Sequence, residues 1–171
     1  MSLTIIIAAM LMAAQPQPAP EALAFEAFNR LAAQEGLWSG DRGAGKKPII
    51  VSIRKIARGS AIVETWYPGT DREALTIYHL DGTTLVADHY CPQGNVPRLV
   101  LDSRSSTDSY HFSFKDGANL AVPGASHEDE FWIRPTSPNS YERTENYVEN
   151  GVTVQPAMGP PDTVSFRRVP E

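Results

Sequence analysis

The sequence predicts an all-β protein with one N-terminal helix, folded as a single antiparallel up-and-down β-barrel of about nine or ten strands. Short apolar runs recur at regular spacing after residue 37, as in an antiparallel sandwich or barrel. Gly-containing turn sequences separate them, and helical periodicity occurs in one segment alone. A closed barrel leaves no exposed sheet edge at this strand number.

The helix is predicted in "PEALAFEAFNRLAAQEG", where Leu23, Phe28 and Leu31 fall near one stripe. It begins after Pro20 and ends before Gly36, consistent with the usual helix start and stop signals.

The predicted strands are bounded by Gly, Pro, Asn or Asp. They cover the neighbours of Trp38 and residues 49–57, 61–67, 74–80, 84–91, 98–102, 110–115, 130–133, 141–149 and 163–169. The turns "ARGS", "PGTD", "LDGT", "KDGA" and "ENGV" each supply a Gly suited to a tight hairpin. Residues 42–48 and 155–162 are expected to be surface loops.

The N-terminal "MSLTIIIAAMLMAA" and the following "QPQPAP" predict a cleaved signal peptide and a Pro-rich linker over 1–20, before a barrel domain over 21–171. The apolar run is shorter than the roughly 20 residues of a transmembrane helix. We therefore expect a periplasmic or secreted protein without a membrane span in the mature chain. The n-region lacks Lys and Arg, and a retained anchor or a disordered start is the alternative.

The composition of the chain limits the kinds of binding partner that can be expected. The formal net charge is −5 and the basic residues are scattered, so nucleic acid is not an expected partner. Cys91 is the single cysteine and cannot form a disulfide within the chain. Its thiol is predicted to be buried, paired with another chain, or reactive. The sequence does not predict an oligomeric state.

The hairpin over 74–91 carries the first candidate binding residues. With Asp81 and Gly82 as its two-residue turn, Tyr78 would face Leu85 and Ile77 would face Val86. Alternation then places one set of side chains together, and we expect this set to point into the barrel: Tyr78, Leu85, Ala87, His89 and Cys91. The other face, with His79 and Asp88, is expected to point outward.

His89 is interpreted as a polar anchor in an apolar pocket, with Tyr78 and Cys91 beside it. The alternative is a buried structural histidine. Glu64, in "IVETW", must be paired or outward, because an unpaired buried charge is too costly. If it points inward, its partner would be His89, Arg98 or Tyr78.

The loop "PQGNVPR" supplies two further candidates. Asn95 either contacts the ligand or stabilises loop amides, and Arg98 either closes over the barrel mouth or pairs with an acid. Of the other histidines, we expect His111 to be solvated and His127 to lie in the exposed acidic loop "SHEDE".

The helix followed by "GLWSGD", with Gly36 and Trp38, resembles the start of the lipocalin-like (calycin) barrels. The run from "GSAIVETW" through "LTIYHLDG" to "HYCPQGNVPRL" is similar to uncharacterised exported bacterial proteins of this class, over about residues 25–150. The resemblance implies a barrel fold and supplies no reaction. The haem-ligand motif of nitrobindin, a more distant barrel, is not matched here.

The leading functional hypothesis is an exported barrel that binds a small, largely apolar ligand without a cofactor. The candidate ligand contacts are Glu64, Tyr78, His89, Cys91, Asn95 and Arg98. An enzyme using His89 as acid or base with Glu64 or Cys91 is the first alternative, although no known catalytic motif is present. A haem or metal site and a structural envelope-associated domain are the others, and a zinc site would need more ligands than "HYC" provides.

Overall fold

The computed structural model describes residues 19–43, 45–120, 122–154 and 163–170. The signal peptide predicted over 1–20 and the loop predicted over 155–162 therefore lie almost wholly outside the described residues. The described chain contains one α-helix, α1 (Pro20–Ala32), a short 3-10 turn, η1 (Ala57–Gly59), and eleven strands. The strands are β1 (Gly36–Gly40), β2 (Ile49–Ile56), β3 (Ala61–Trp66), β4 (Ala74–Asp81), β5 (Thr84–Tyr90), β6 (Val96–Leu101), β7 (Tyr110–Ala118), β8 (His127–Ser137), β9 (Ser140–Glu149), β10 (Val152–Val154) and β11 (Val164–Arg168).

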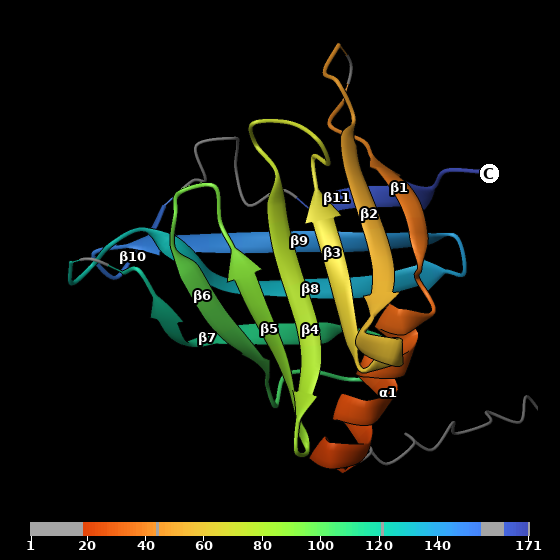
Figure 1. Ribbon diagram of the computed structural model, residues 1–171, viewed down its shortest axis with the longest axis horizontal. Coiled ribbons are helices and arrows are strands. Elements are labelled where there is room, and N and C mark those ends of the chain that lie inside the picture. The colour runs from red at the N-terminus through yellow and green to blue at the C-terminus, as the bar shows by residue number, and fades with distance from the viewer. Residues whose placement is uncertain (1–18, 44, 121, 155–162, 171) are drawn as a thin grey trace, which may run out of the picture.

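The strands form a closed antiparallel barrel (Figure 1). From β1 to β9 each strand pairs with the next along the chain, and β11 completes the ring between β9 and β1. Ten strands make the ring, and β10 pairs outside it with the end of β9. This confirms the predicted fold class.

The strand β9 is shared by three neighbours. The strand β8 pairs along one edge of it, whereas β11 pairs with residues 140–143 and β10 with residues 147–149 of the other edge. Glu145 lies between these two pairing segments. Its side chain is 25% exposed, so it lies at a point where the interior approaches solvent.

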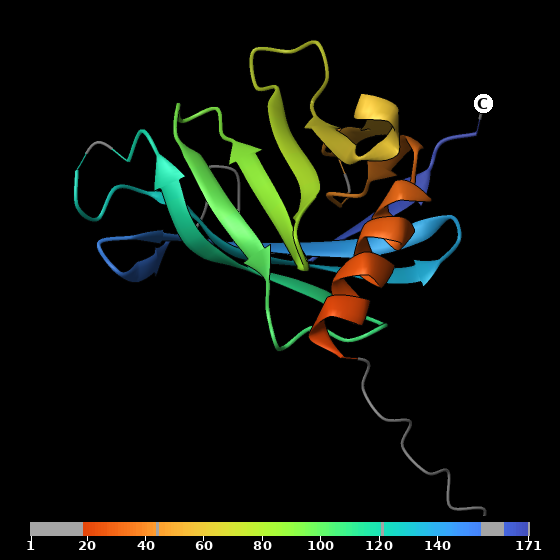
Figure 2. The same cartoon turned by 60° about the horizontal axis from the view of Figure 1, so that its bottom comes forward.

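The helix α1 lies beside the end of the barrel at which β4 and β5 are joined (Figure 2). Its apolar stripe of Leu23, Ala24, Ala27, Phe28 and Leu31 is buried in the same core as the barrel interior. We call this end of the barrel the helix end. Pro20 lies in the first turn of the helix, where a backbone N–H would have no partner within the helix. Proline, which lacks this N–H, is therefore well suited to the start of α1.

Trp38 joins the end of the helix to the barrel. Its indole N–H donates to the Gln34 carbonyl at 2.8 Å, and the Arg168 guanidinium lies over its ring. Gly36 has φ +140°, and a Cβ there would lie 2.6 Å from Arg168 Nη1. The positive φ favours glycine at this position, while the Arg168 side chain could move aside, and Gly36 with Trp38 is the element that suggested the fold.

Two strand predictions need correction. The strand predicted over 130–133 extends over His127–Ser137, because a bulge after Glu128 and a Pro at 135 obscure the alternation. The short β10 was not predicted, since three residues carry too weak a pattern.

The predicted hairpin register is also wrong. Asp81 pairs with Thr84, so Gly82 and Thr83 form the turn, and Tyr78 faces Ala87 instead of Leu85. Gly82, at φ +60°, occupies the first turn position, which demands a positive φ. The pairing moves by two residues, an even number, so the inward face is unchanged. Tyr78 and His89 still share it.

Candidate functional site

A group of buried polar side chains lies inside the barrel, further from α1 than the apolar core of the helix end. We call it the polar cluster. Its members come from β3, β4, β5, β8 and β9 and are Glu64, Thr76, Tyr78, His89, Glu128, Arg143 and Glu145.

Three members of the polar cluster lie in one row across neighbouring strands. Glu64 pairs with Thr76 on the neighbouring strand, and Thr76 pairs with His89 on the next. Partners directly opposite each other in a sheet share a face. All three are at most 4% exposed. The alternation that points Ile62 and Trp66 inward on β3 therefore also carries the Glu64 carboxylate into the interior.

Arg143 is the centre of the cluster. One terminal nitrogen donates to Glu64 Oε2 at 3.0 Å and to the Tyr78 hydroxyl at 2.9 Å. Nε donates to Glu145 at 2.7 Å and Nη2 to Glu128 Oε1 at 3.3 Å. The guanidinium is fully buried and lies over the Phe131 ring at 3.9 Å from its centroid. All three of its nitrogens are engaged within the protein.

Tyr78 is held in the same network. Its hydroxyl donates to Glu64 Oε2 at 2.6 Å. Burial, followed by the negative charge of Glu64, raises the pKa of Tyr78 well above its ordinary value. The phenol is therefore a neutral donor. Because Tyr78 and Arg143 both bind Glu64, these two residues fix the carboxylate in one orientation.

Carboxyl groups outnumber cations in the cluster. Glu64, Glu128 and Glu145 face one guanidinium, that of Arg143. Burial raises the pKa of Glu128 to about 7, with Arg143 opposing the shift. Burial also raises the pKa of Glu145. Near neutral pH the carboxyl group of Glu128 is therefore about half protonated.

His89 is the second group with an altered titration. Its Nδ1 lies 3.0 Å from the Thr76 hydroxyl and 3.7 Å from Glu128 Oε2. Burial lowers the pKa of His89 to about 4, so the imidazole is neutral at pH 7. Among the cluster residues that the structure describes, two buried atoms have no hydrogen-bond partner: His89 Nε2 and Glu128 Oε2.

Cys91 and Asn95 occupy one tight turn at the end of β5. The Cys91 N–H donates to the Asn95 carbonyl, and the Gly94 N–H donates back to the Cys91 carbonyl. The Asn95 side chain donates to the Ser126 carbonyl at 2.7 Å, so it links two loops. Burial raises the pKa of the Cys91 thiol, which keeps it protonated at neutral pH. Both residues therefore have a structural role in the loop.

Arg98 does not approach the cluster. It points outward from β6, where Nε donates to Asp88 at 2.9 Å, and it is 46% exposed. The expected alternative of an acidic partner is realised on the outer surface, and the pairing of Arg98 with Glu64 is wrong. Tyr78 is the one partner of Glu64 among the three that were considered.

The remaining histidines lie outside the cluster. His79 points outward near Asp88, as predicted. His111 is not simply solvated: it stacks on Trp132 with an interplanar angle of 10°. His127 is the first residue of β8, lies against Phe114, and is half-buried, so the exposed loop predicted at "SHEDE" is wrong.

Four cluster residues were missed from the sequence, and the first is Thr76, which lies on the predicted 74–80 strand but was not singled out. Glu128 lies in the segment read as an exposed loop, and Arg143 and Glu145 lie on a predicted strand whose inward face was not assigned. A signal was present on β9, where Tyr141, Arg143, Glu145 and Tyr147 alternate with polar residues. Aromatic residues at both ends of that set would have indicated that Arg143 and Glu145 face the core.

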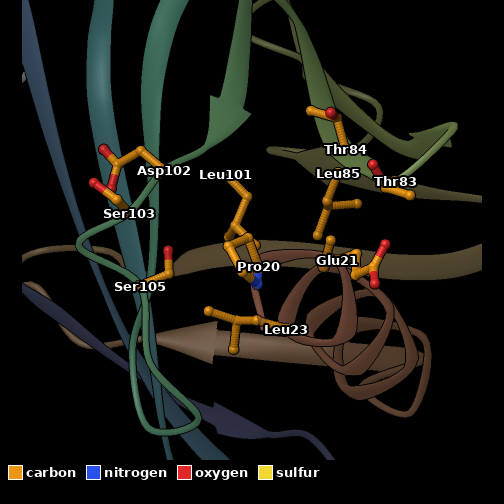
Figure 3. Close-up of a pocket in the computed structure, with 11 residues that line it drawn as sticks. Pro20, Glu21, Leu23, Thr83, Thr84, Leu85, Leu101, Asp102, Ser103 and Ser105 are labelled. Carbon is orange, nitrogen blue, oxygen red and sulfur yellow. The ribbon is translucent and has the colours of Figure 1, made fainter. Parts of the chain in front are cut away.

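A separate cleft lies at the helix end of the barrel, between α1 and the strands, with a volume of about 330 Å³ (Figure 3). It is formed by the start of α1, the turn between β4 and β5, and the segment after β6. Leu23, Leu85 and Leu101 provide its apolar lining, and Glu21 and Asp102 lie at its rim. None of the residues predicted as ligand contacts lines it.

Within the part of the chain that the structure describes, no group of three His, Cys, Asp or Glu residues is arranged to hold a metal ion. No helix among the described residues has both the length and the apolar character needed to span a membrane.

Comparison with known proteins adds no information about the site of this chain. No protein-family model matches the chain, and no curated protein matches it. The crystal structure of Treponema pallidum Tp0751 (pallilysin) is similar to 89% of this chain and 98% of that chain, with 11% sequence identity and a TM-score of 0.31. A likeness at that level carries no argument about function. The assignment of a lipocalin-like barrel depends on the strand pairing of this chain.

Proposed function

We propose that this protein is a small-molecule binding barrel that holds a largely apolar ligand in its interior, against the polar cluster. The observation that carries the proposal is that two buried atoms of the polar cluster, His89 Nε2 and Glu128 Oε2, have no partner among the described residues. A polar atom buried without a partner costs about 1–3 kcal/mol. A ligand that hydrogen-bonds to these atoms would recover that free energy.

The chemical character of the surroundings supports this role. Small-ligand sites are mostly apolar and contain a few fixed polar groups. Aromatic rings flank the cluster: Phe131 lies under Arg143, Phe112 stacks on Phe131 at 4.6 Å, and Trp66 lies 5.1 Å from the guanidinium. These buried rings make the surroundings of the cluster apolar.

The cluster members divide by role. Arg143 and Tyr78 use their donors on Glu64, Glu128 and Glu145, so they are positioning residues. His89 and Glu128 keep one free atom each and are the proposed ligand contacts. The Cys91 thiol has a raised pKa, and neutral His89 has lost most of its basicity, which weighs against the thiol and imidazole chemistry of the enzyme alternative.

We also propose that the protein works outside the cytoplasm. The proposal rests on the apolar run over 3–14 and the Pro-rich segment after it, which fit a cleaved export signal. Cell fractionation combined with the intact mass of the recovered protein tests it. A cytoplasmic protein that retains its first 14 residues would contradict it.

Native mass spectrometry of protein purified from its host tests the binding function. We expect an excess mass on wild-type protein that disappears on denaturation. His89→Leu should lower the ligand-bound fraction at least tenfold while the circular dichroism spectrum stays that of the folded barrel. His79→Leu, on the outer face of the neighbouring strand, is the matched control and should retain the ligand.

Two results would contradict the proposal. One is a bare mass for wild-type protein at every protein concentration. The other is an equal bound fraction in wild type and His89→Leu.

A further inference from the structure

We propose that the buried group of the ligand is a cationic nitrogen, such as a primary ammonium, held beside Glu128 and Glu145, and that its binding displaces the proton from those molecules in which Glu128 is protonated. This inference rests on the proposed function and specifies the chemical class of ligand for the same site. No bond is made or broken other than the O–H bond of the carboxyl group, whose proton passes to solvent.

The charges that face Glu128 show why a cation is expected. The strand β9 contributes Arg143, Glu145 and the neutral phenol of Tyr147. The strand β5 contributes the imidazole of His89, and the protonated thiol of Cys91 follows directly after this strand. Two elements further round the barrel, β3 and β4, contribute Glu64 and the neutral phenol of Tyr78. Three carboxyl groups thus share one permanent cation.

Arg143 cannot neutralise all of them. Its short contacts, between 2.7 and 3.0 Å, go to Glu145, Glu64 and Tyr78. The contact with Glu128 Oε1 is the longest, at 3.3 Å, and Glu128 Oε2 receives no donor within the described residues. Glu128 is therefore the carboxyl group with the weakest internal compensation.

An uncompensated charge of this kind is costly in a protein interior, where it is removed either by a proton or by an opposite charge. The free protein uses the proton, since Glu128 has a pKa of about 7. An ammonium group would replace that proton with three N–H donors and a full charge. Glu145, one quarter exposed, lies between the pairing segments of β9 and gives a carboxylate on the solvent side of the same group.

Other ligand classes fit less well. A carboxylate or phosphate would face Glu64, Glu128 and Glu145, and the guanidinium that might attract it is already engaged. A neutral alcohol could bind Glu128 but would leave the charge of the cluster unchanged.

The test uses three probes with the same apolar body and different heads: n-hexylammonium, 1-hexanol and hexanoate. Binding to the whole protein is measured by isothermal titration calorimetry at pH 6, 7 and 8, in pairs of buffers with different ionisation enthalpies. We expect n-hexylammonium to bind at least tenfold more tightly than 1-hexanol, and hexanoate to bind most weakly. The affinity for n-hexylammonium should rise about tenfold from pH 6 to pH 8, and its binding at pH 7 should release about half a proton.

Glu128→Gln preserves the shape of the side chain and an oxygen for Arg143. It should lower the affinity for n-hexylammonium at pH 8 at least tenfold and remove its pH dependence. The control is Glu149→Gln, at an exposed position on the same strand as Arg143 and Glu145. It should bind as wild type does, which separates a local contact from a general loss of negative charge.

The outcomes separate this inference from the proposed function. Equal or tighter binding of 1-hexanol or hexanoate would overturn the cationic head and leave a binding barrel. Binding of n-hexylammonium without proton release, or unchanged in Glu128→Gln, would also overturn it. If none of the probes binds, the inference is wrong, and the native mass measurement then decides the proposed function independently.

Discussion

The two ends of the barrel interior are built from the same strands but differ in chemistry. At the helix end, Leu80 pairs with Leu85, and the row is covered by the apolar stripe of α1. Four residues back along β4, roughly 13 Å away, Thr76 pairs with His89 in the polar cluster. The strand geometry is the same in both rows, so the difference comes from the side chains alone.

The two ends of the barrel interior therefore differ in what they contribute to stability. Burial of apolar side chains at the helix end stabilises the fold in a way that pH does not change. The polar cluster buries three carboxyl groups around Arg143, an arrangement that seldom adds stability over a well-packed apolar core. The helix end therefore maintains the barrel, and under the proposed function the polar cluster provides the binding groups.

The largest effect is expected from Arg143→Ala, which removes the cation shared by the three carboxyl groups. Breaking a buried ion network in this way costs about 3–5 kcal/mol in the free energy of unfolding. Urea denaturation at pH 7 measures it. The control is Arg134→Ala, whose exposed ion pair with Glu142 on the outer face should contribute less than about 1 kcal/mol. Equal losses in the two variants would contradict the central role of Arg143.

Leu85→Ala is the corresponding change at the helix end. Leu85 is fully buried, so truncation should cost about 2–5 kcal/mol. The loss should be the same at pH 5 and pH 8, because no titrating group of the cluster pairs with Leu85. A loss that depends strongly on pH would show that the two ends are coupled.

Within the polar cluster, Glu128 and His89 should make stability depend on pH in opposite directions. Glu128 has its pKa raised from 4.5 to about 7 in the folded state, so its contribution to stability is present below pH 4.5 and is lost as pH rises through 7. His89 has its pKa lowered from 6.5 to about 4, so its contribution is present above pH 6.5 and is lost as pH falls through 4. These opposite slopes nearly cancel in the wild type.

Each variant should therefore reveal the slope of the other residue. Relative to wild type, Glu128→Gln should gain roughly 3 kcal/mol of stability as pH rises from 4 to 7, and His89→Gln should lose a similar amount over that range. Urea denaturation at half-unit pH intervals measures both slopes. Parallel profiles for the wild type and both variants would show that these two groups do not titrate in the folded protein as described.

The smallest effect is expected from Arg98→Ala. Arg98 pairs with Asp88 and Asp116 on the outer surface and is 46% exposed, so the loss should be less than about 1 kcal/mol. Ligand occupancy in native mass spectrometry should equal that of wild type. A lowered occupancy would place Arg98 at the binding site after all.

The fold class could be predicted from the sequence, and so could some of the side chains that point into the barrel. Alternation is a local property of a strand, so the inward face of the 74–91 hairpin could be read although its register was wrong by two residues. The same property predicted that Tyr78 and His89 would lie together inside, with Tyr78 as a possible partner of Glu64. Trp38 and Gly36 likewise indicated the start of a lipocalin-like barrel.

Which charges meet depends on how the strands are arranged in the folded barrel. Arg143 contacts Glu64 across 79 residues of chain, and this contact exists because β8 and β9 close the barrel opposite β3, β4 and β5. The bulge after Glu128 turns a residue from an apparent acidic loop into the interior. Local patterns specify the face on which a side chain lies, but the partner across a barrel depends on the closure and relative stagger of all ten strands, which no short stretch of sequence encodes.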